Sequence, residues 1–143
     1  MEMETIWHGE VTLDMLKKRN ENTFASLLEI EFTKIGANYM IATIPIMQKH
    51  KQPIGIMNGG VSCGIAESVG STAANYVIDY DKQYCVGLDI NTNHIRPVSS
   101  GVITAKTFPY HIGRTTHVWS IEIMNENNKM VSINRITMAV KNR

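Results

Sequence analysis

Residues 58–78, NGGVSCGIAESVGSTAANYVI, contain the long helical pattern that decides the fold of this sequence of 143 residues. Apolar side chains recur there at every fourth position and predict one apolar stripe along a helix. The stripe consists of Val61, Ile65, Val69, Ala73 and Val77. Because the segment is largely apolar, we expect this helix to be buried against the rest of the chain.

A second stripe on the same helix carries small residues and a single carboxylate. It consists of Gly60, Gly64, Glu67, Ser71 and Ala74, whose spacings of four and three residues hold one line along a helix. This stripe predicts that Glu67 lies in a crevice. The alternative is that the glycines only allow close helix packing and that Glu67 points to solvent.

The segments before this helix predict two short helical turns, two strands and a loop. Thr12 is a candidate N-cap for the first turn, with Leu13 and Leu16 on one side of it. The second turn is expected at residues 24–28, the strands at 29–34 and 39–46, and the loop at 48–57.

After the helix the sequence period drops to two. Tyr84, Val86, Leu88 and Ile90 alternate with small or polar residues, which predicts a half-buried strand, and Pro97 with the SSG at 99–101 ends it. Further strands are expected at 102–108, 115–124 and 130–140, with turns at 111–114 and 125–129. Strands clustered after a single long helix favour an α+β fold, in which an antiparallel sheet wraps around the helix.

Length and composition predict a single domain over residues 1–143. Hydrophobic residues make up 43% of the chain and charged residues 19%, which argues against a disordered chain. The formal net charge of +1 gives no indication of a nucleic acid partner. No run approaches the ~20 apolar residues needed to cross a membrane, and the N-terminal segment lacks the apolar core of a signal peptide. We therefore expect a cytoplasmic protein.

The sequence predicts neither a disulfide framework nor a metal site. Cys63 and Cys85 are far apart, no CxxC motif is present, and the histidines do not cluster. We interpret His8, His50 and His117 as ordinary surface or packing residues.

The glycines at the start of the helix form a candidate site. The first backbone N–H groups of a helix lack partners within it, and the helix dipole adds partial positive charge there. Because Gly59 and Gly60 have no Cβ, a ligand oxygen can approach those N–H groups closely. This arrangement suits polarisation of a carbonyl or stabilisation of an oxyanion.

The stretch QPIGIMNGGVSCGIAESVGS at 52–71, followed by NTNHIRPV at 91–98 and HIGR at 111–114, resembles the hotdog-fold acyl-CoA thioesterases. The similarity is to the glutamate-dependent branch, which includes 4-hydroxybenzoyl-CoA and 1,4-dihydroxy-2-naphthoyl-CoA thioesterases and phenylacetate-pathway relatives. It covers nearly the whole chain. It implies a long helix wrapped by an antiparallel sheet, sheet pairing between two protomers, and active sites at their interface.

The resemblance implies roles for four residues near the helix. Glu67 matches the catalytic carboxylate, which acts as general base toward water or as nucleophile forming an acyl-enzyme anhydride. Gly59 matches the residue whose N–H polarises the thioester carbonyl, and Gln52 matches a loop amide near that carbonyl. Ser71 matches a hydroxyl that steadies water or the leaving thiol, with a small packing residue as the equal alternative.

Asn58 departs from the family pattern, which has histidine before the two glycines. An asparagine amide can donate a hydrogen bond but cannot titrate. Either a donor is sufficient at this position or the chemistry is altered. Asparagine is also a good helix N-cap.

Two further segments match parts of the family that meet coenzyme A. They contain His94 and Arg96 before Pro97, and His111, Gly113 and Arg114 in the second segment. Arginine suits phosphate because its planar guanidinium presents several donors.

Together these features predict an acyl-CoA thioesterase that uses no cofactor and forms at least a homodimer, with a homotetramer expected. A non-catalytic acyl-CoA-binding module on the same fold is the alternative, because fold alone does not fix function. A hydratase is a third option, but the Asp/His pair usual in hotdog hydratases is not evident. The acyl group cannot be read from the sequence.

Overall fold

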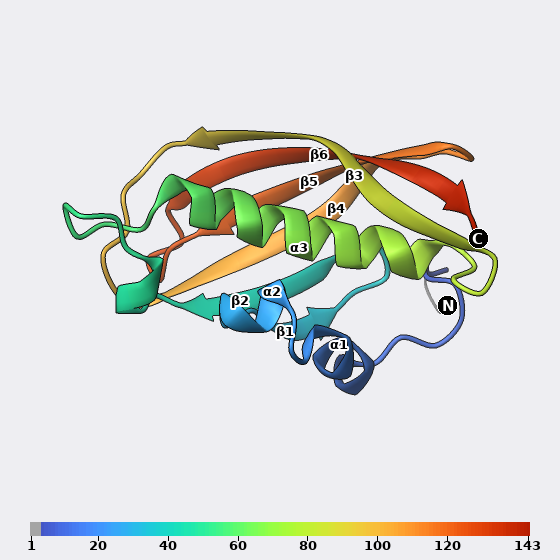
Figure 1. The fold of residues 1–143 in the computed structure, drawn as a ribbon, viewed down its shortest axis with the longest axis horizontal. Helices are drawn as coiled ribbons and strands as arrows, with labels where there is room; N and C mark the ends of the chain where they lie inside the picture. The colour runs from blue at the N-terminus through green and yellow to red at the C-terminus, as the bar shows by residue number, and fades with distance from the viewer. Residues whose placement is uncertain (1–3) are drawn as a thin grey trace.

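The computed structural model describes residues 4–143, in which one long helix lies against a six-stranded antiparallel sheet (Figure 1). The helices are α1 (Leu13–Asn20), α2 (Phe24–Leu27) and α3 (Gly59–Val77), with a 3-10 turn, η1, at Gln48–His50. The strands are β1 (Glu31–Ile35), β2 (Met40–Pro45), β3 (Gln83–His94), β4 (Val102–Ile112), β5 (Thr116–Met124) and β6 (Met130–Asn142). Across the sheet they follow the order β1-β2-β4-β5-β6-β3. The predicted α+β class is confirmed.

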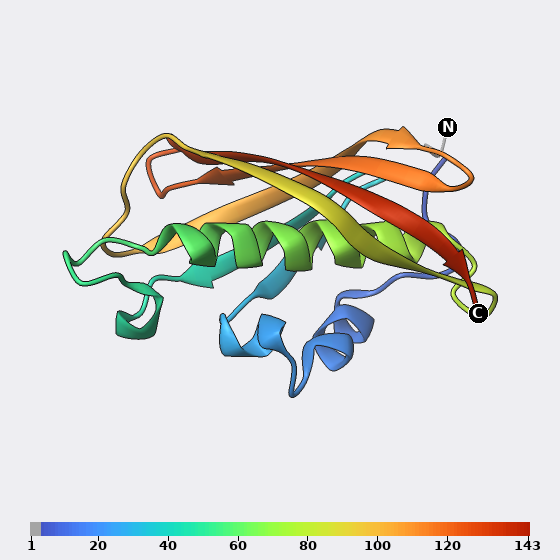
Figure 2. The same ribbon diagram turned by 45° about the horizontal axis from the view of Figure 1, so that its top comes forward.

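Helix α3 packs into the concave side of the sheet, which curves over it (Figure 2). The predicted apolar stripe faces the core: Ile65, Val69 and Ala73 are fully buried. Val61 and Val77, at the two ends of the stripe, are partly buried against the same core. The period of apolar residues in the sequence therefore identified the buried face of the helix correctly.

Gly70 allows α3 to lie close to the sheet. A Cβ atom at this position would come within 2.9 Å of Ile136 Cγ2 and 3.0 Å of Ile121 Cδ1, which is closer than packed carbon atoms approach. A larger residue would therefore push the helix away from β5 and β6, and the requirement for glycine is one of space.

Strand β3 forms one edge of the sheet and is tied to α3 by Asn75. Asn75 Oδ1 accepts a hydrogen bond from the Cys85 N–H (2.8 Å), and Asn75 Nδ2 donates to the Cys85 carbonyl (3.2 Å). Beyond this tie, the pairing of β3 with β6 shifts register between Gly87 and Asp89, and such a bulge bends a strand. Asn75 therefore sets where β3 begins to run along the helix.

Helices α1 and α2 lie on the other side of α3 from β3 (Figure 1). Thr12 caps α1 as predicted, because its Oγ1 accepts a hydrogen bond from the Met15 N–H (3.2 Å). Helix α2 packs against α3, where a Cβ on Gly64 would come within 2.9 Å of Phe24 Cε1. Phe24 nevertheless remains 56% exposed, so α2 presents an apolar edge beside α3.

Strand β3 ends at His94, before Pro97, as the sequence predicted. Strand β4 continues further than predicted, to Ile112, so the turn expected at 111–114 is confined to residues 113–115 and His111 lies within a strand. The register shift between Pro109 and His111 accommodates proline, which has no N–H to donate, and pairing with β5 resumes after it.

Replacing Asn75 by alanine should destabilise the protein by about 1–3 kcal/mol, because the buried N–H and C=O of Cys85 would lose their partner. Urea denaturation followed by circular dichroism measures this change in the free energy of unfolding. Asn93→Ala is the matched control, since Asn93 is exposed on β3 and its loss should cost less than about 0.5 kcal/mol. Equal losses in the two variants would contradict the role assigned to Asn75.

Candidate active site

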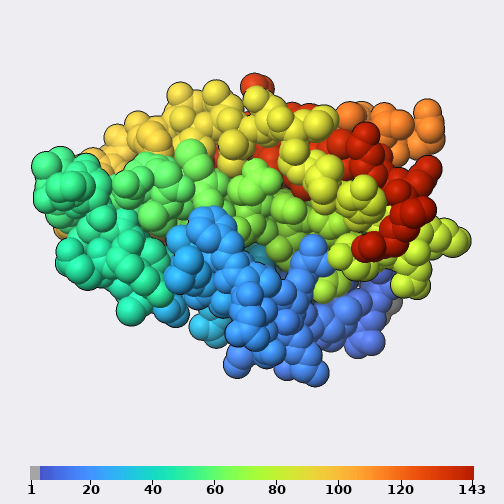
Figure 3. Space-filling view, in the orientation of Figure 1, coloured from blue at the N-terminus to red at the C-terminus, as the bar shows by residue number. Residues whose placement is uncertain are grey.

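Part of α3 reaches the surface between β3 and the N-terminal helices (Figure 3). Gly60 is exposed, Gly64, Glu67 and Ser71 are half-buried, and Ala74 is buried. Neither the sheet nor α2 fully covers this face of the helix. Glu67 is therefore accessible from the surface of a single chain while its carboxylate is partly withdrawn from water.

Glu67 points toward β3, where its carboxylate lies against Gly87. A Cβ at Gly87 would overlap the carboxylate, so glycine on the strand makes room for the side chain. Within residues 4–143, Glu67 takes part in no salt bridge, and burial alone raises the pKa of its carboxyl above the usual range. A carboxylate in this state is a better proton acceptor than an exposed one.

A pocket of about 390 Å³ opens at the N-terminus of α3. Gln52, Gly59, His94 and Arg96 line it, so four of the residues selected from the sequence meet there. The imidazole of His94 lies so close to Gly59 that a Cβ on Gly59 would come within 2.8 Å of His94 Nε2. In the described part of the chain, the Gly59 N–H has no backbone acceptor, so it can donate to a ligand in the pocket.

The side-chain oxygens of Asn58 and Gln52 already have local partners. Asn58 Oδ1 accepts a hydrogen bond from the Gly60 N–H (2.7 Å), which confirms its predicted role as the N-cap of α3. Gln52 Oε1 accepts from the Ile54 N–H (2.9 Å) within the loop. Their remaining polar groups are amide NH₂ donors, which match the oxygen of a carbonyl.

Arg96 is exposed at the rim of this pocket. Its Nη1 donates a hydrogen bond to the Met130 carbonyl at 2.9 Å, which fixes the direction of the side chain. A guanidinium has further N–H donors, so Arg96 keeps the capacity to bind an anion.

His111, Gly113 and Arg114 lie at the end of the β4–β5 hairpin, at the opposite end of the molecule from the start of α3 (Figure 1). Strand pairing places His94 level with Ala105 of β4, and β4 continues for seven more residues before the hairpin turn. At ~3.3 Å per residue this corresponds to about 23 Å along the strand. One chain therefore does not bring the two predicted coenzyme A segments together.

Two residues of this region were not identified from the sequence. Gly87 provides the space for Glu67, but a glycine within a strand pattern does not indicate which side chain will face it. His50 was interpreted as an ordinary surface or packing residue; it is a packing residue, 1% exposed, and the sequence did not indicate that its ring contacts the backbone of Leu28 and Met47. The contact with Leu28 joins residues 22 positions apart, so no local pattern could indicate it.

These side chains limit the chemistry that the site can perform. Glu67 can accept a proton, the amide donors can polarise a carbonyl, and Arg96 can bind phosphate. Within residues 4–143 there is no group of three His, Cys, Asp or Glu side chains placed to hold a metal ion. Over the same residues, no helix has both the length and the apolar character needed to cross a membrane.

Residues 54–132 match the family model described as the thioesterase superfamily. The chain belongs to this superfamily. A thioesterase of Pseudomonas aeruginosa, solved as a mutant, is 37% identical, with a TM-score of 0.95 over 97% of this chain and 100% of that chain. A thioesterase of Haemophilus influenzae is 39% identical, with a TM-score of 0.93 over 96% of each chain.

A curated relative supports the same family. The 1,4-dihydroxy-2-naphthoyl-CoA hydrolase of Escherichia coli is 37% identical over 135 residues, which cover 94% of this chain and 98% of the relative. The resemblance drawn from the sequence is confirmed, and so is the hotdog fold, with its central helix packed against an antiparallel sheet. By homology this superfamily member is a thioesterase-type hydrolase.

Glu67→Gln should make this thioesterase more stable at neutral pH, because the neutral amide avoids burying an unpaired charge. The pKa of Glu67 is raised in the folded chain, so ionisation of the carboxyl favours the unfolded state. The gain, up to about 1 kcal/mol, should be complete above the folded pKa. This gain in stability should vanish as the pH falls below 4.5, the ordinary pKa of a glutamate carboxyl, because Glu67 is then protonated in both the folded and the unfolded chain.

Thermal unfolding at a series of pH values measures this effect. Glu10→Gln is the control, because Glu10 is an exposed glutamate and its replacement should leave the melting temperature unchanged at every pH. A Glu67→Gln protein that is less stable than the natural chain at neutral pH would show that Glu67 is stabilised by a partner.

Proposed function

We propose that this thioesterase hydrolyses an acyl-CoA or aroyl-CoA thioester to the free acid and coenzyme A. The observation that carries the proposal is Glu67, a half-buried carboxylate of raised pKa on an accessible face of α3, with no salt-bridge partner among residues 4–143. The name of the E. coli relative, a hydrolase of a CoA ester, supports this substrate class. A thioester carbonyl is already activated, so a carboxylate and well-placed N–H donors are sufficient for its hydrolysis.

Two routes use Glu67. As a general base it removes a proton from water, whose oxygen attacks the carbonyl carbon, and the proton then passes to the departing thiolate as the C–S bond breaks. As a nucleophile it attacks the carbonyl itself and expels the thiolate, and water then hydrolyses the resulting anhydride. Ser71 follows Glu67 by one helical turn, and it is the hydroxyl that we propose steadies the water or the leaving thiol.

The Gly59 N–H is the proposed donor to the thioester carbonyl. It lies at the positive end of the α3 dipole and lines the pocket together with Gln52. Negative charge grows on the carbonyl oxygen as the tetrahedral intermediate forms, so a fixed donor at this point stabilises the transition state more than the ground state. Gln52, which lines the same pocket, adds an amide donor, and Asn58, the residue before Gly59, is the second amide donor that we propose.

Gly59 and Glu67 of one chain are too far apart to act on the same carbonyl. Eight residues separate them along α3, and at ~1.5 Å per residue this is about 12 Å. Two copies of α3 lying antiparallel would place Glu67 of one chain near Gly59 of the other. The spacing along the helix therefore favours an active site shared between two protomers.

The edge of β3 is the surface that we propose for this dimer. Edge strands expose unpaired backbone groups, and β3 also exposes Val86 (41%) and Leu88 (62%). Antiparallel pairing of two β3 edges around a two-fold axis would extend the sheet and bring the two α3 helices side by side. Association of two such dimers into a homotetramer stays a prediction.

A dimer of this kind also accounts for the separation of the two coenzyme A segments. In such a two-fold dimer, opposite ends of the two chains lie beside each other. The β4–β5 hairpin of one protomer therefore lies toward the pocket of the other. We propose that His94 and Arg96 hold one part of coenzyme A and that the partner's hairpin, with His111, Gly113 and Arg114, holds another.

A non-catalytic acyl-CoA-binding module is the second candidate, and Asn58 is the observation that favours it. The family's histidine is replaced by a residue whose oxygen is committed to capping α3. A panel of benzoyl, naphthoyl and fatty acyl thioesters, followed by release of free thiol, distinguishes the two functions. Turnover establishes the enzyme, and binding without turnover establishes the module.

Glu67→Ala should lower kcat by about two or more orders of magnitude, because it removes the group that moves the proton or attacks the carbonyl. Thiol release from the best substrate of the panel measures kcat, and circular dichroism confirms that the variant is folded. Glu10→Ala is the matched control and should retain full activity. A folded Glu67→Ala protein with normal kcat would rule out both routes.

Arg96→Ala and Arg114→Ala should raise KM several-fold with little change in kcat, because phosphate contacts remote from the carbonyl bind the ground state and the transition state equally. The effect should disappear with a truncated pantetheine thioester, which has no nucleotide phosphates. Arg135→Ala, an exposed arginine of β6, is the control. If full-length and truncated thioesters lose affinity equally, these arginines do not bind the phosphates.

A further inference from the structure

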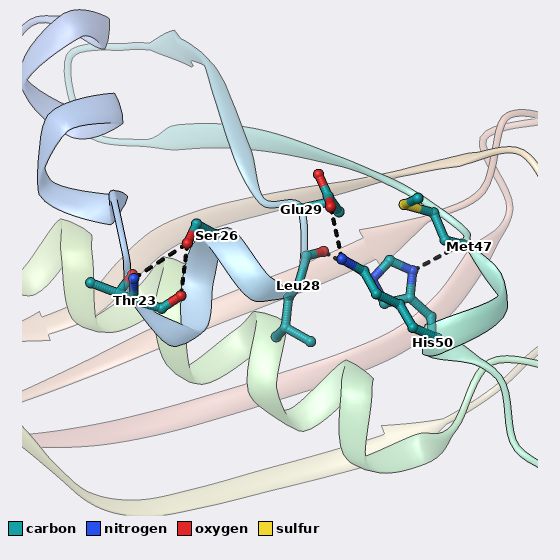
Figure 4. Close-up of polar contacts among 7 residues, drawn as sticks. Thr23, Ser26, Leu28, Glu29, Met47 and His50 are labelled. Atoms are coloured by element: carbon teal, nitrogen blue, oxygen red, sulfur yellow. Dashed lines mark hydrogen bonds and ion pairs between the residues drawn. The ribbon is translucent and has the colours of Figure 1, made fainter.

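His50 connects three segments of the chain at the base of the loop that leads into α3. The side chain is 1% exposed, and both ring nitrogens have backbone partners (Figure 4). Nδ1 lies 2.9 Å from the Met47 nitrogen, and Nε2 lies 3.1 Å from the Leu28 carbonyl oxygen. Leu28 follows α2 and Met47 follows β2, so the ring bridges elements that are far apart in the sequence.

These partners define the protonation state of the ring. The Met47 N–H is a donor, so Nδ1 accepts, and the Leu28 carbonyl is an acceptor, so Nε2 carries the hydrogen. A doubly protonated ring would direct a second N–H at the Met47 N–H and break that bond. Burial lowers the pKa of His50, which keeps the ring neutral at neutral pH.

The charged groups that face the ring are Lys49 of η1 and Glu29 next to Leu28. They pair with each other at 2.7 Å, and both side chains are about two-fifths exposed, at 41% and 42%. Because exposed ion pairs contribute little, this pair is a weak second link between the same two segments.

The backbone of His50 continues the connection to the active site. Its carbonyl accepts a hydrogen bond from the Asn58 N–H (2.8 Å), and Asn58 Oδ1 accepts from the Gly60 N–H (2.7 Å). The Gly59 N–H, which has no backbone acceptor within residues 4–143, belongs to the residue between Asn58 and Gly60. A short series of hydrogen bonds therefore leads from Leu28 through His50 to the first residues of α3.

We propose that His50 is a positioning residue whose neutral ring holds the start of α3 in place, so that the Gly59 N–H is aimed at the substrate carbonyl. The inference rests on the proposed function, because it assigns a purpose to the direction of that N–H. Protonation of the ring releases Met47 and loosens the connection to Asn58. The alignment of the donor is thereby coupled to the protonation of a side chain that does not line the pocket.

An NMR titration tests the coupling without any use of activity. The titration uses the Glu67→Gln protein, so that titration of Glu67 cannot shift the signals that are followed. The ring should be the Nε2–H tautomer at neutral pH, and the amide signals of Gly59 and Gly60 should shift with the same midpoint as the ring. In Glu67→Gln with His50→Gln, that transition should be absent. An Nδ1–H tautomer, or glycine signals that do not follow the ring, would overturn the proposal.

Kinetics test the consequence for catalysis. His50→Ala should lower kcat by about tenfold or more while KM changes by less than about threefold, because misplacement of a donor affects the transition state. His50→Gln should recover kcat to within about threefold, since its amide can still donate to the Leu28 carbonyl, whereas His50→Asn should not. Lys49→Ala is the matched control and should leave kcat unchanged.

The kinetic test remains decisive if His50→Ala does not fold. The comparison of His50→Gln with His50→Asn shows by itself whether kcat depends on the hydrogen bond to the Leu28 carbonyl. Equal kcat in these two variants, or normal kcat in a folded His50→Ala protein, would overturn the proposal. Failure of the natural chain to hydrolyse any acyl-CoA would instead overturn the proposed function. In that case the NMR titration still decides whether His50 positions the start of α3.

Discussion

Close packing of α3 against the concave side of the sheet is the constraint on which the rest of this structure depends. Gly70 permits the approach, since any side chain there would collide with Ile121 and Ile136. With the apolar stripe committed to this contact, the face that carries Glu67 turns toward the surface. The position of the carboxylate is therefore a consequence of core packing, because the same helix supplies both the core and the site.

The site combines a charge that is partly deprived of water with donors that lack acceptors. Glu67 is half-buried beside Gly87, and burial raises the pKa of its carboxyl. The Gly59 N–H has no backbone acceptor in the described chain. In the described chain neither group has a protein partner, and a thioester with its attacking water would supply a partner to each.

A single chain does not bring the proposed site residues together. Glu67, the proposed proton acceptor, and Gly59, the proposed carbonyl donor, are separated along the axis of one rigid helix, and the two segments proposed to bind coenzyme A lie at opposite ends of the sheet. Rotation of side chains cannot close distances of this size. A second copy can do so, because two-fold symmetry reverses the direction of every element and places opposite ends together. Dimer formation along β3 would thus be a condition for catalysis.

The sequence by itself determined the α+β class, the buried face of α3, the N-caps Thr12 and Asn58, and the place of Glu67 on a stripe of small residues. These features follow from side-chain periods and capping chemistry, which act over a few residues. The end of β4 was misjudged, because strand length depends on how far a partner strand continues. Only the tertiary structure decided that Gly87 faces Glu67, that His94 lies against Gly59 and that His50 bonds to Leu28. Each of these contacts joins residues 20 or more positions apart, where the shape of the packed core, and no local pattern, selects the partner.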